Sequence, residues 1–146
     1  MDHQEKAAQL FVSGYNCAQA VAGAFSDITG ISLEQSCKMV SGFGGGMGRM
    51  REVCGAVSGM VFVLSTLYGY ETPDPAAQKN IYACVQNLAE KFRQECGTII
   101  CRELLKNPPS DPAPTPRDAE FYKVRPCARF VILAAKLLDE YIAAQG

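Results

Sequence analysis

The stretch from Val53 to Tyr70 contains no charged residue, and this feature limits the folds that the chain can adopt. A segment of this length and apolarity either crosses a membrane or lies at the centre of a folded domain. Glycines and hydroxyl side chains interrupt it, charged residues closely precede it, and the sequence has no second stretch of the kind. We therefore expect a buried central helix and no insertion into a membrane.

Apolar residues recur at helical spacing through most of the remaining sequence, and no period of two indicates a strand. Besides the central helix, the pattern predicts helices over residues 3–13, 16–28, 32–40, 76–95 and 98–105, and a last helix that begins at Pro126. Asn16, Ser32 and Thr98 are suited to cap helices, and glycines follow several of the expected ends. The fold class predicted is all-α: a single-domain bundle of about six or seven helices over residues 1–146.

Two segments are too rich in glycine or proline for regular structure. Residues 41–51 read SGFGGGMGRMR, and a glycine run of this kind is unfavourable in helices and strands. Residues 107–117 carry prolines at positions 108, 109, 112, 114 and 116. We expect this proline-rich segment to be an extended surface loop within the domain, either as a flexible cover or as slack between two helices.

Charge and histidine content exclude several function classes. Lys and Arg number 14 against 15 Asp and Glu, so the formal net charge is −1, whereas binding to nucleic acid or to an anionic membrane needs clustered positive charge. The only histidine is His3, which removes most chemistry that needs a positioned imidazole. No carboxylate pair has the spacing of a general acid and base, so the sequence leaves open whether the chain is an enzyme.

The seven cysteines are the chemically distinctive group. The chain start, MDHQEK, shows no secretory signal, so we expect a cytoplasmic protein whose thiols stay reduced. No two cysteines form a Cys-x-x-Cys pair, and any shared site must be assembled by the fold. Packing alone explains each cysteine on the apolar face of a predicted helix, namely Cys17, Cys37, Cys84, Cys101 and Cys127.

Cys54 differs because it lies in the first turn of the predicted central helix, just after Arg49 and Arg51. Unpaired backbone N–H groups and positive charge favour a thiolate at such a position. Cys54 is therefore a candidate metal ligand or catalytic thiol. The following Gly55 and Gly59 lie one turn apart and allow either a neighbouring helix or a compact inorganic group to come close.

The glycine run supplies a second candidate site. Gly44, Gly45, Gly46 and Gly48 can present successive backbone N–H groups to an anion, as in phosphate sites and around the sulfurs of iron–sulfur clusters. A nucleotide is not favoured, because the Lys-Ser/Thr ending of a P-loop is missing and no strand precedes the run. A sharp connection is the alternative interpretation.

Several motifs together resemble one protein family. They are YNCAQAV at residues 15–21, SGFGGGMGR at 41–49, VCGAVSG at 53–59, and ICRELL at 100–105, followed later by Pro126-Cys127. In type and order they are similar to the C_GCAxxG_C_C family, whose members are described as redox-active. The resemblance spans most of the chain and implies signature cysteines at Cys17, Cys54, Cys101 and Cys127. In a related domain of split-Soret-type cytochromes, the cysteines are associated with an iron–sulfur centre.

The resemblance favours an iron–sulfur cluster bound by Cys17, Cys54, Cys101 and Cys127, with the amides of residues 44–48 stabilising its charge. The protein then transfers electrons, as a carrier or an accessory subunit, to a redox partner protein. Structural zinc in the same four-thiolate site is one alternative. Thiol–disulfide chemistry is another, in which Cys54 attacks and one of the other three resolves. A helical interaction module with buried thiols and no cofactor is the third, and a homodimer is compatible with the sequence.

Overall fold

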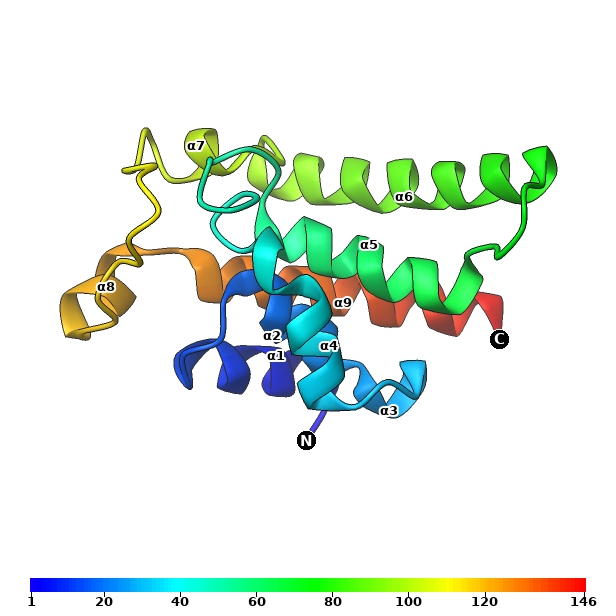
Figure 1. Cartoon of the computed structure of the whole chain (residues 1–146), viewed down its shortest axis with the longest axis horizontal. Helices are drawn as coiled ribbons and strands as arrows, with labels where there is room; N and C mark the ends of the chain where they lie inside the picture. Colours follow the sequence, from blue (N-terminus) through cyan, green and yellow to red (C-terminus); the bar gives the residue numbers. More distant parts are fainter.

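The chain folds into helices joined mostly by short connections, as the computed structural model shows (Figure 1). It describes the backbone of residues 1–146 and every side chain except those of Glu120, Lys123 and Val124. The helices are α1 (His3–Val12), α2 (Cys17–Ala24), α3 (Ser26–Thr29), α4 (Leu33–Val40), α5 (Gly55–Tyr68), α6 (Pro75–Cys96), α7 (Cys101–Leu104), α8 (Ala119–Val124) and α9 (Cys127–Gln145), with a 3-10 turn η1 (Ser41–Phe43) before the glycine run. The described residues form no strand, which confirms the all-α class.

The helix boundaries follow from local side-chain chemistry. Asn16 caps α2 through a capping box, in which its side chain accepts from the Gln19 N–H and the Gln19 side chain accepts from the Asn16 N–H. Ser32 caps α4, accepting from the Gln35 N–H at 3.1 Å. Gly97 ends α6 with a φ of 88°, a left-handed conformation that glycine adopts without steric cost. These boundaries agree with the sequence prediction.

Three boundaries differ from the prediction. The helix expected over residues 16–28 divides at Phe25, where the Ser26 hydroxyl donates back to the Gly23 carbonyl at 2.9 Å and closes a tight turn. α7 begins at Cys101, so that Thr98 is not its cap; the Thr98 hydroxyl instead accepts from the Ile100 N–H at 3.1 Å. α8 was not predicted, and Asp118 caps it by accepting from the Phe121 N–H at 2.9 Å.

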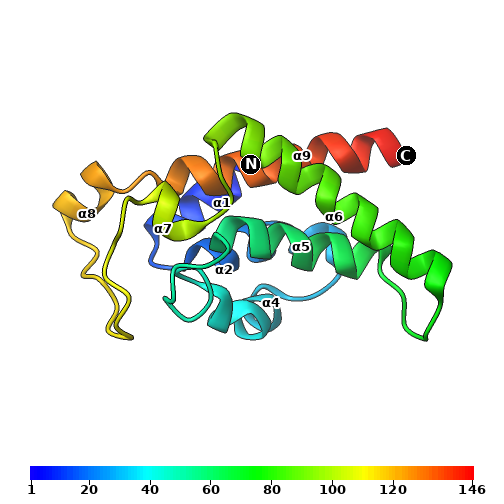
Figure 2. The same ribbon diagram turned by 90° about the horizontal axis from the view of Figure 1, so that it is seen from above.

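The core forms where α2, α5 and α9 pack on one another, with α1 and α4 against α2, and α6 across α5 and α9 (Figure 2). α5 is central as predicted and buries Val57, Met60, Val63 and Leu64, although Ser65 and Thr66 near its end are exposed. α2 is enclosed more completely and contacts α1, α3, α4, α5 and α9. No helix in the described part of the chain has the length and apolarity that crossing a membrane requires.

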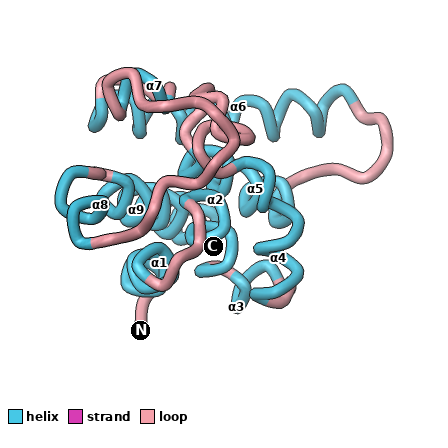
Figure 3. The backbone as a smooth tube through the Cα atoms, turned by 60° about the vertical axis from the view of Figure 1, so that its left-hand side comes forward, coloured by secondary structure: helices cyan, strands magenta, loops and turns pink.

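The irregular segments gather at one end of the bundle. The glycine run, α7, the proline-rich segment and α8 lie on the left of Figure 1. In Figure 3, where this side comes forward, the pink loops cross in front of the helix ends. The proline-rich segment is fixed by two arginines. Arg49 donates to the Asp111 carbonyl and the Thr115 hydroxyl, and Arg51 donates through Nε to the Pro109 carbonyl at 2.8 Å. The proline-rich segment is therefore held in a fixed position and forms a wall at this end of the bundle. It is not slack between two helices.

We predict that Gly59→Ala destabilises the fold. A Cβ at Gly59 would lie 2.8 Å from the Ala18 carbonyl oxygen and 2.9 Å from the Val21 Cβ, so α5 and α2 must separate. Overpacking of this kind costs about 1–3 kcal/mol in the free energy of unfolding, which denaturant titration measures. Gly42→Ala is the matched control, because nothing lies within 4 Å of the added Cβ and its φ is not positive. Equal stability of the two variants would contradict the close packing.

Candidate functional site

The four signature cysteines each stand where a helix begins, and the structure brings them together. Cys17, Cys101 and Cys127 are the first residues of α2, α7 and α9, and Cys54 is the N-cap of α5. All four line one small cavity of about 30 Å³. Helix N-termini carry unpaired N–H groups and a partial positive charge, a contribution that favours negatively charged sulfur and opposes the effect of burial. We call it the cysteine cavity.

A short antiparallel pairing places Cys54 beside Cys101. The Cys54 N–H donates to the Ile99 carbonyl at 2.8 Å, the Cys101 N–H donates to the Glu52 carbonyl at 2.6 Å, and an isolated bridge joins Val53 to Ile100. Cys17 and Cys127 come from the opposite side, where α2 packs on α9. All seven cysteines are free thiols, and the other three, Cys37, Cys84 and Cys96, do not line the cavity.

Arg51 is the unusual charged group at this site. Its side chain is buried, with 5% of its surface exposed, and its Nη1 lies 3.7 Å from the Cys101 sulfur. Among the described residues, no carboxylate forms an ion pair with it. A buried cation is costly unless an anion compensates it, and the Cys101 sulfur that Arg51 contacts can become an anion.

The glycine run forms part of the cavity wall, and several of its N–H groups bond within the run. The N–H groups of residues 47–52 donate to carbonyls from Gly42 to Met47. Among the four glycines expected to hold an anion, Gly48 therefore uses its N–H group inside the run. Gly45 and Gly46 line the cavity, whereas Gly44 and Gly48 line a larger pocket beside it. A Cβ at Gly46 would meet the Cys101 Cβ and the Arg51 Cα, each at 2.7 Å.

The two glycines after Cys54 have different roles. Gly55 lines the cysteine cavity, where its lack of a side chain leaves room beside Cys54. Gly59 faces the backbone of α2 at Ala18, so helix packing accounts for it, and it does not line the cavity. The sequence allowed either a neighbouring helix or a compact inorganic group to come close to these glycines. Gly59 supports the neighbouring helix.

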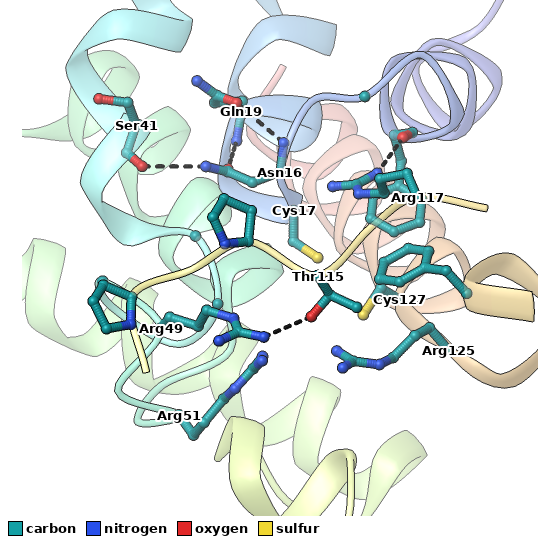
Figure 4. A pocket seen from close by; sticks show the side chains of 18 residues that line it. Asn16, Cys17, Gln19, Ser41, Arg49, Arg51, Thr115, Arg117, Arg125 and Cys127 are labelled. Atoms are coloured by element: carbon teal, nitrogen blue, oxygen red, sulfur yellow. Dashed lines mark hydrogen bonds between the residues drawn. The ribbon is translucent and has the colours of Figure 1, made fainter. Parts of the chain in front are cut away.

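A larger pocket of about 560 Å³ adjoins the cysteine cavity (Figure 4). The two share Cys17, Gly45, Arg51 and Cys127. Four arginines line it, and the sequence analysis identified only Arg49 and Arg51 as neighbours of the site; Arg117 and Arg125 were missed. A signal for Arg125 was present, since it stands two residues before a signature cysteine in the order Arg125-Pro126-Cys127.

Comparison with known proteins agrees with this arrangement. Residues 15–141 match the family described as "Putative redox-active protein (C_GCAxxG_C_C)". The chain belongs to this family. Neither a curated protein nor a solved structure matches it. Cys17, Cys54, Cys101 and Cys127, to which the resemblance to this family pointed, line one cavity at the loop end of the bundle.

Burial controls the acidity of Cys54 and Cys101. Desolvation raises the pKa of Cys54 to about 12, although the N–H groups of Ala56 and Val57 act in the opposite direction. The thiolate expected at Cys54 from its position at a helix N-terminus is therefore disfavoured, because desolvation outweighs the helix N-terminus. Burial also raises the pKa of Cys101, while Arg51 partly compensates.

Cys127 behaves differently from the other signature cysteines. A hydrogen bond with the Cys17 side chain lowers the pKa of Cys127 despite burial, and Arg125, Arg117 and Arg51 lower it further. The same hydrogen bond and burial raise the pKa of Cys17 well above its ordinary value. The pair therefore favours a thiolate at Cys127 that receives a hydrogen bond from a protonated Cys17.

The described residues place no group of three or more His, Cys, Asp or Glu side chains close enough to hold a single metal ion. A single zinc ion and an iron–sulfur cluster at this cavity would both take the four cysteine sulfurs as ligands. A cluster distributes its four cysteine ligands over two or four iron atoms, and the donor set at the cavity has the required number and type.

We predict that Cys127 is the first signature cysteine to be alkylated in reduced, metal-free protein. Near pH 7, iodoacetamide should modify Cys127 at least about tenfold faster than Cys54, because each pKa unit changes the thiolate fraction about tenfold. Peptide mass spectrometry over a time course measures both rates. Cys17→Ala removes the hydrogen bond and should slow modification of Cys127. Equal rates at Cys54 and Cys127 would contradict the assignment.

Proposed function

We propose that the chain is an electron-transfer protein in which Cys17, Cys54, Cys101 and Cys127 bind an iron–sulfur cluster. The observation that carries this proposal is that four helices begin at these four cysteines around one cavity. A disulfide exchanger needs two cysteines, whereas two-iron and four-iron clusters are held by four. The family's description as redox-active supports the same chemistry.

The charges around the cavity suit such a group. Clusters bound by four thiolates carry negative charge, which the helix N-termini and the buried Arg51 compensate. Gly45 and Gly46 line the cavity, and their N–H groups, which donate to no backbone carbonyl among the described loop contacts, could donate to sulfur. Compensation of this kind favours the reduced, more negative state and so raises the reduction potential.

The lining of the cysteine cavity is compatible with a compact inorganic group. The cavity is small, at about 30 Å³, and Gly46 and Gly55 place no side chain in it. Cys17 and Cys127 also line the larger pocket, so a cluster held by the four cysteines would lie next to that pocket. Leu104, Leu105 and Phe130 add apolar side chains to the cavity lining, which would keep water from the sulfurs.

When bound, the cluster supplies one-electron transfer. The chain's own residues hold the four cysteine ligands in place, keep water away and leave one edge of the site at the loop end of the bundle. We further propose that a redox partner protein exchanges electrons there. A cytoplasmic location, where thiols stay reduced until they bind iron, accords with this function.

We predict that protein purified without oxygen is brown and contains iron and acid-labile sulfide in matching amounts. Cys54→Ser should lose both, since serine is a poor cluster ligand, and visible absorbance with iron and sulfide assays measures the loss. Cys37→Ser is the matched control, because Cys37 is buried on α4 away from the cavity. Circular dichroism checks that both variants fold. Equal iron in the two variants, or a colourless protein after anaerobic reconstitution, would overturn the proposal.

A second function is favoured by one specific observation: Cys17 and Cys127 line the larger pocket, whereas Cys54 and Cys101 do not. In this function the Cys127 thiolate attacks a disulfide of a partner protein, forming a mixed disulfide and releasing one partner thiolate. Cys17, after losing its proton, then attacks Cys127 sulfur, which forms the Cys17–Cys127 disulfide and releases the second partner thiol. A colourless protein that gains this disulfide while its partner's is reduced would establish it.

A further inference from the structure

The larger pocket has a marked imbalance of charge. Arg49, Arg51, Arg117 and Arg125 line it, and none of its described lining residues is acidic. The chain as a whole has a net charge of −1, so this concentration of arginines is a local feature and not a property of the composition. An enclosed surface with one sign of charge attracts ligands of the opposite sign.

Arg117 and Arg125 are held in place by contacts that do not neutralise them. Arg117 donates to the carbonyls of Phe11 and Tyr15 at 2.8 and 2.9 Å, and its guanidinium lies 4.5 Å from the centre of the Phe11 ring. The Arg125 guanidinium lies 5.3 Å from the centre of the Phe121 ring. Carbonyls and rings fix the orientation of a guanidinium but leave its charge.

Figure 4 shows the guanidinium groups of Arg49, Arg51 and Arg125 pointing into the same pocket, around Thr115 and the sulfurs of Cys17 and Cys127. Among the described carboxylates, only Asp111 pairs with any of the four pocket arginines, with its Oδ1 3.3 Å from Arg49, and Asp111 is an exposed residue that does not line the pocket. Like charges directed into one space repel one another, and a bound anion relieves this repulsion.

The size and lining of the pocket indicate an organic ligand. A volume of about 560 Å³ lies within the usual range for small-molecule sites and exceeds what a bare inorganic ion fills. Phe11, Phe121, Pro112 and Pro114 supply apolar surface, and polar side chains such as Asn16 and Thr115 supply hydrogen-bonding groups. A molecule with an apolar body and one anionic group matches both halves of this lining.

We propose that this pocket binds a small organic anion, with its carboxylate or phosphate group on the arginines and its body beside Cys17 and Cys127. The assignment goes beyond electron transfer, since it gives the protein a small-molecule ligand next to its redox site. It does not depend on the cluster, because Arg49, Arg117 and Arg125 do not line the cysteine cavity. The competing account is that the four arginines serve only to offset the charge of the cluster.

The test is isothermal titration calorimetry on the full chain, both as purified without oxygen and after iron has been removed by a chelator. Three probes share one phenyl ring: benzoate, phenyl phosphate and the neutral benzyl alcohol. Benzoate and phenyl phosphate distinguish a carboxylate from a phosphate ligand. At least one of them should bind, benzyl alcohol should not, and added salt should weaken the binding.

Arg125→Gln should weaken binding of the anionic probe about tenfold or more, because it removes a charge-assisted contact. Arg93→Gln makes the same change on the exposed face of α6, outside the pocket, and should leave binding unchanged. If Arg125→Gln does not fold, Arg49→Gln replaces it. Failure of both anions to bind either form of the protein, or binding that benzyl alcohol matches, would overturn the proposal.

The outcomes separate this proposal from the proposed redox function. A protein that binds iron but neither anion supports the cluster and rejects the anion site, and loss of iron in Arg125→Gln would then assign the arginines to the cluster. A protein that binds no iron but discriminates between phenyl phosphate and benzyl alcohol supports the anion site and rejects the cluster.

Discussion

The site depends on the antiparallel pairing of residues 51–54 with residues 99–102. Cys101 begins a helix of only four residues, which is too short to be positioned by helix packing alone. A hydrogen bond from the Cys101 N–H to the Glu52 carbonyl, at 2.6 Å, therefore positions this helix. The exposed ion pair between Arg102 and Glu52, at 3.0 Å, is a second contact between the two segments. Without this pairing the cysteine cavity would have three sulfurs from the helix core and none from α7.

Backbone strain accompanies the placement of the arginines. Met47, Arg49 and Arg51 have φ values of 68°, 64° and 63°, a left-handed region that typically costs non-glycine residues of order 1–3 kcal/mol each. Hydrogen bonds within the run hold this conformation, including Arg49 N–H to Gly44 and Arg51 N–H to Gly45 carbonyls at 3.2 and 3.1 Å. Glycine at these positions would relieve the strain but would remove both guanidinium groups from the pocket.

The sequence predicted most of the helices because their signals are local. Apolar spacing locates α6 and α9, and the capping residues Asn16 and Ser32 mark the starts of α2 and α4. The division at Phe25 and the acidity of Cys54 were not predictable in this way, since both are decided by tertiary burial and by side-chain contacts. The four cysteines could be named only through family resemblance, because no spacing along the chain places Cys17 near Cys127. Arg117 and Arg125 join the pocket through the unpredicted segment around α8.

The wall formed by the proline-rich segment separates the surface of the larger pocket from the helices that form the core. Pro112, Pro114 and Thr115 face the larger pocket but lie outside the buried core cluster. Two of the arginine contacts that fix this wall are made to main-chain carbonyls, those of Pro109 and Asp111. Side chains along the wall can therefore be exchanged while these anchors persist. Substitutions there would change the surface of the larger pocket at little cost to folding and without moving the four cysteines.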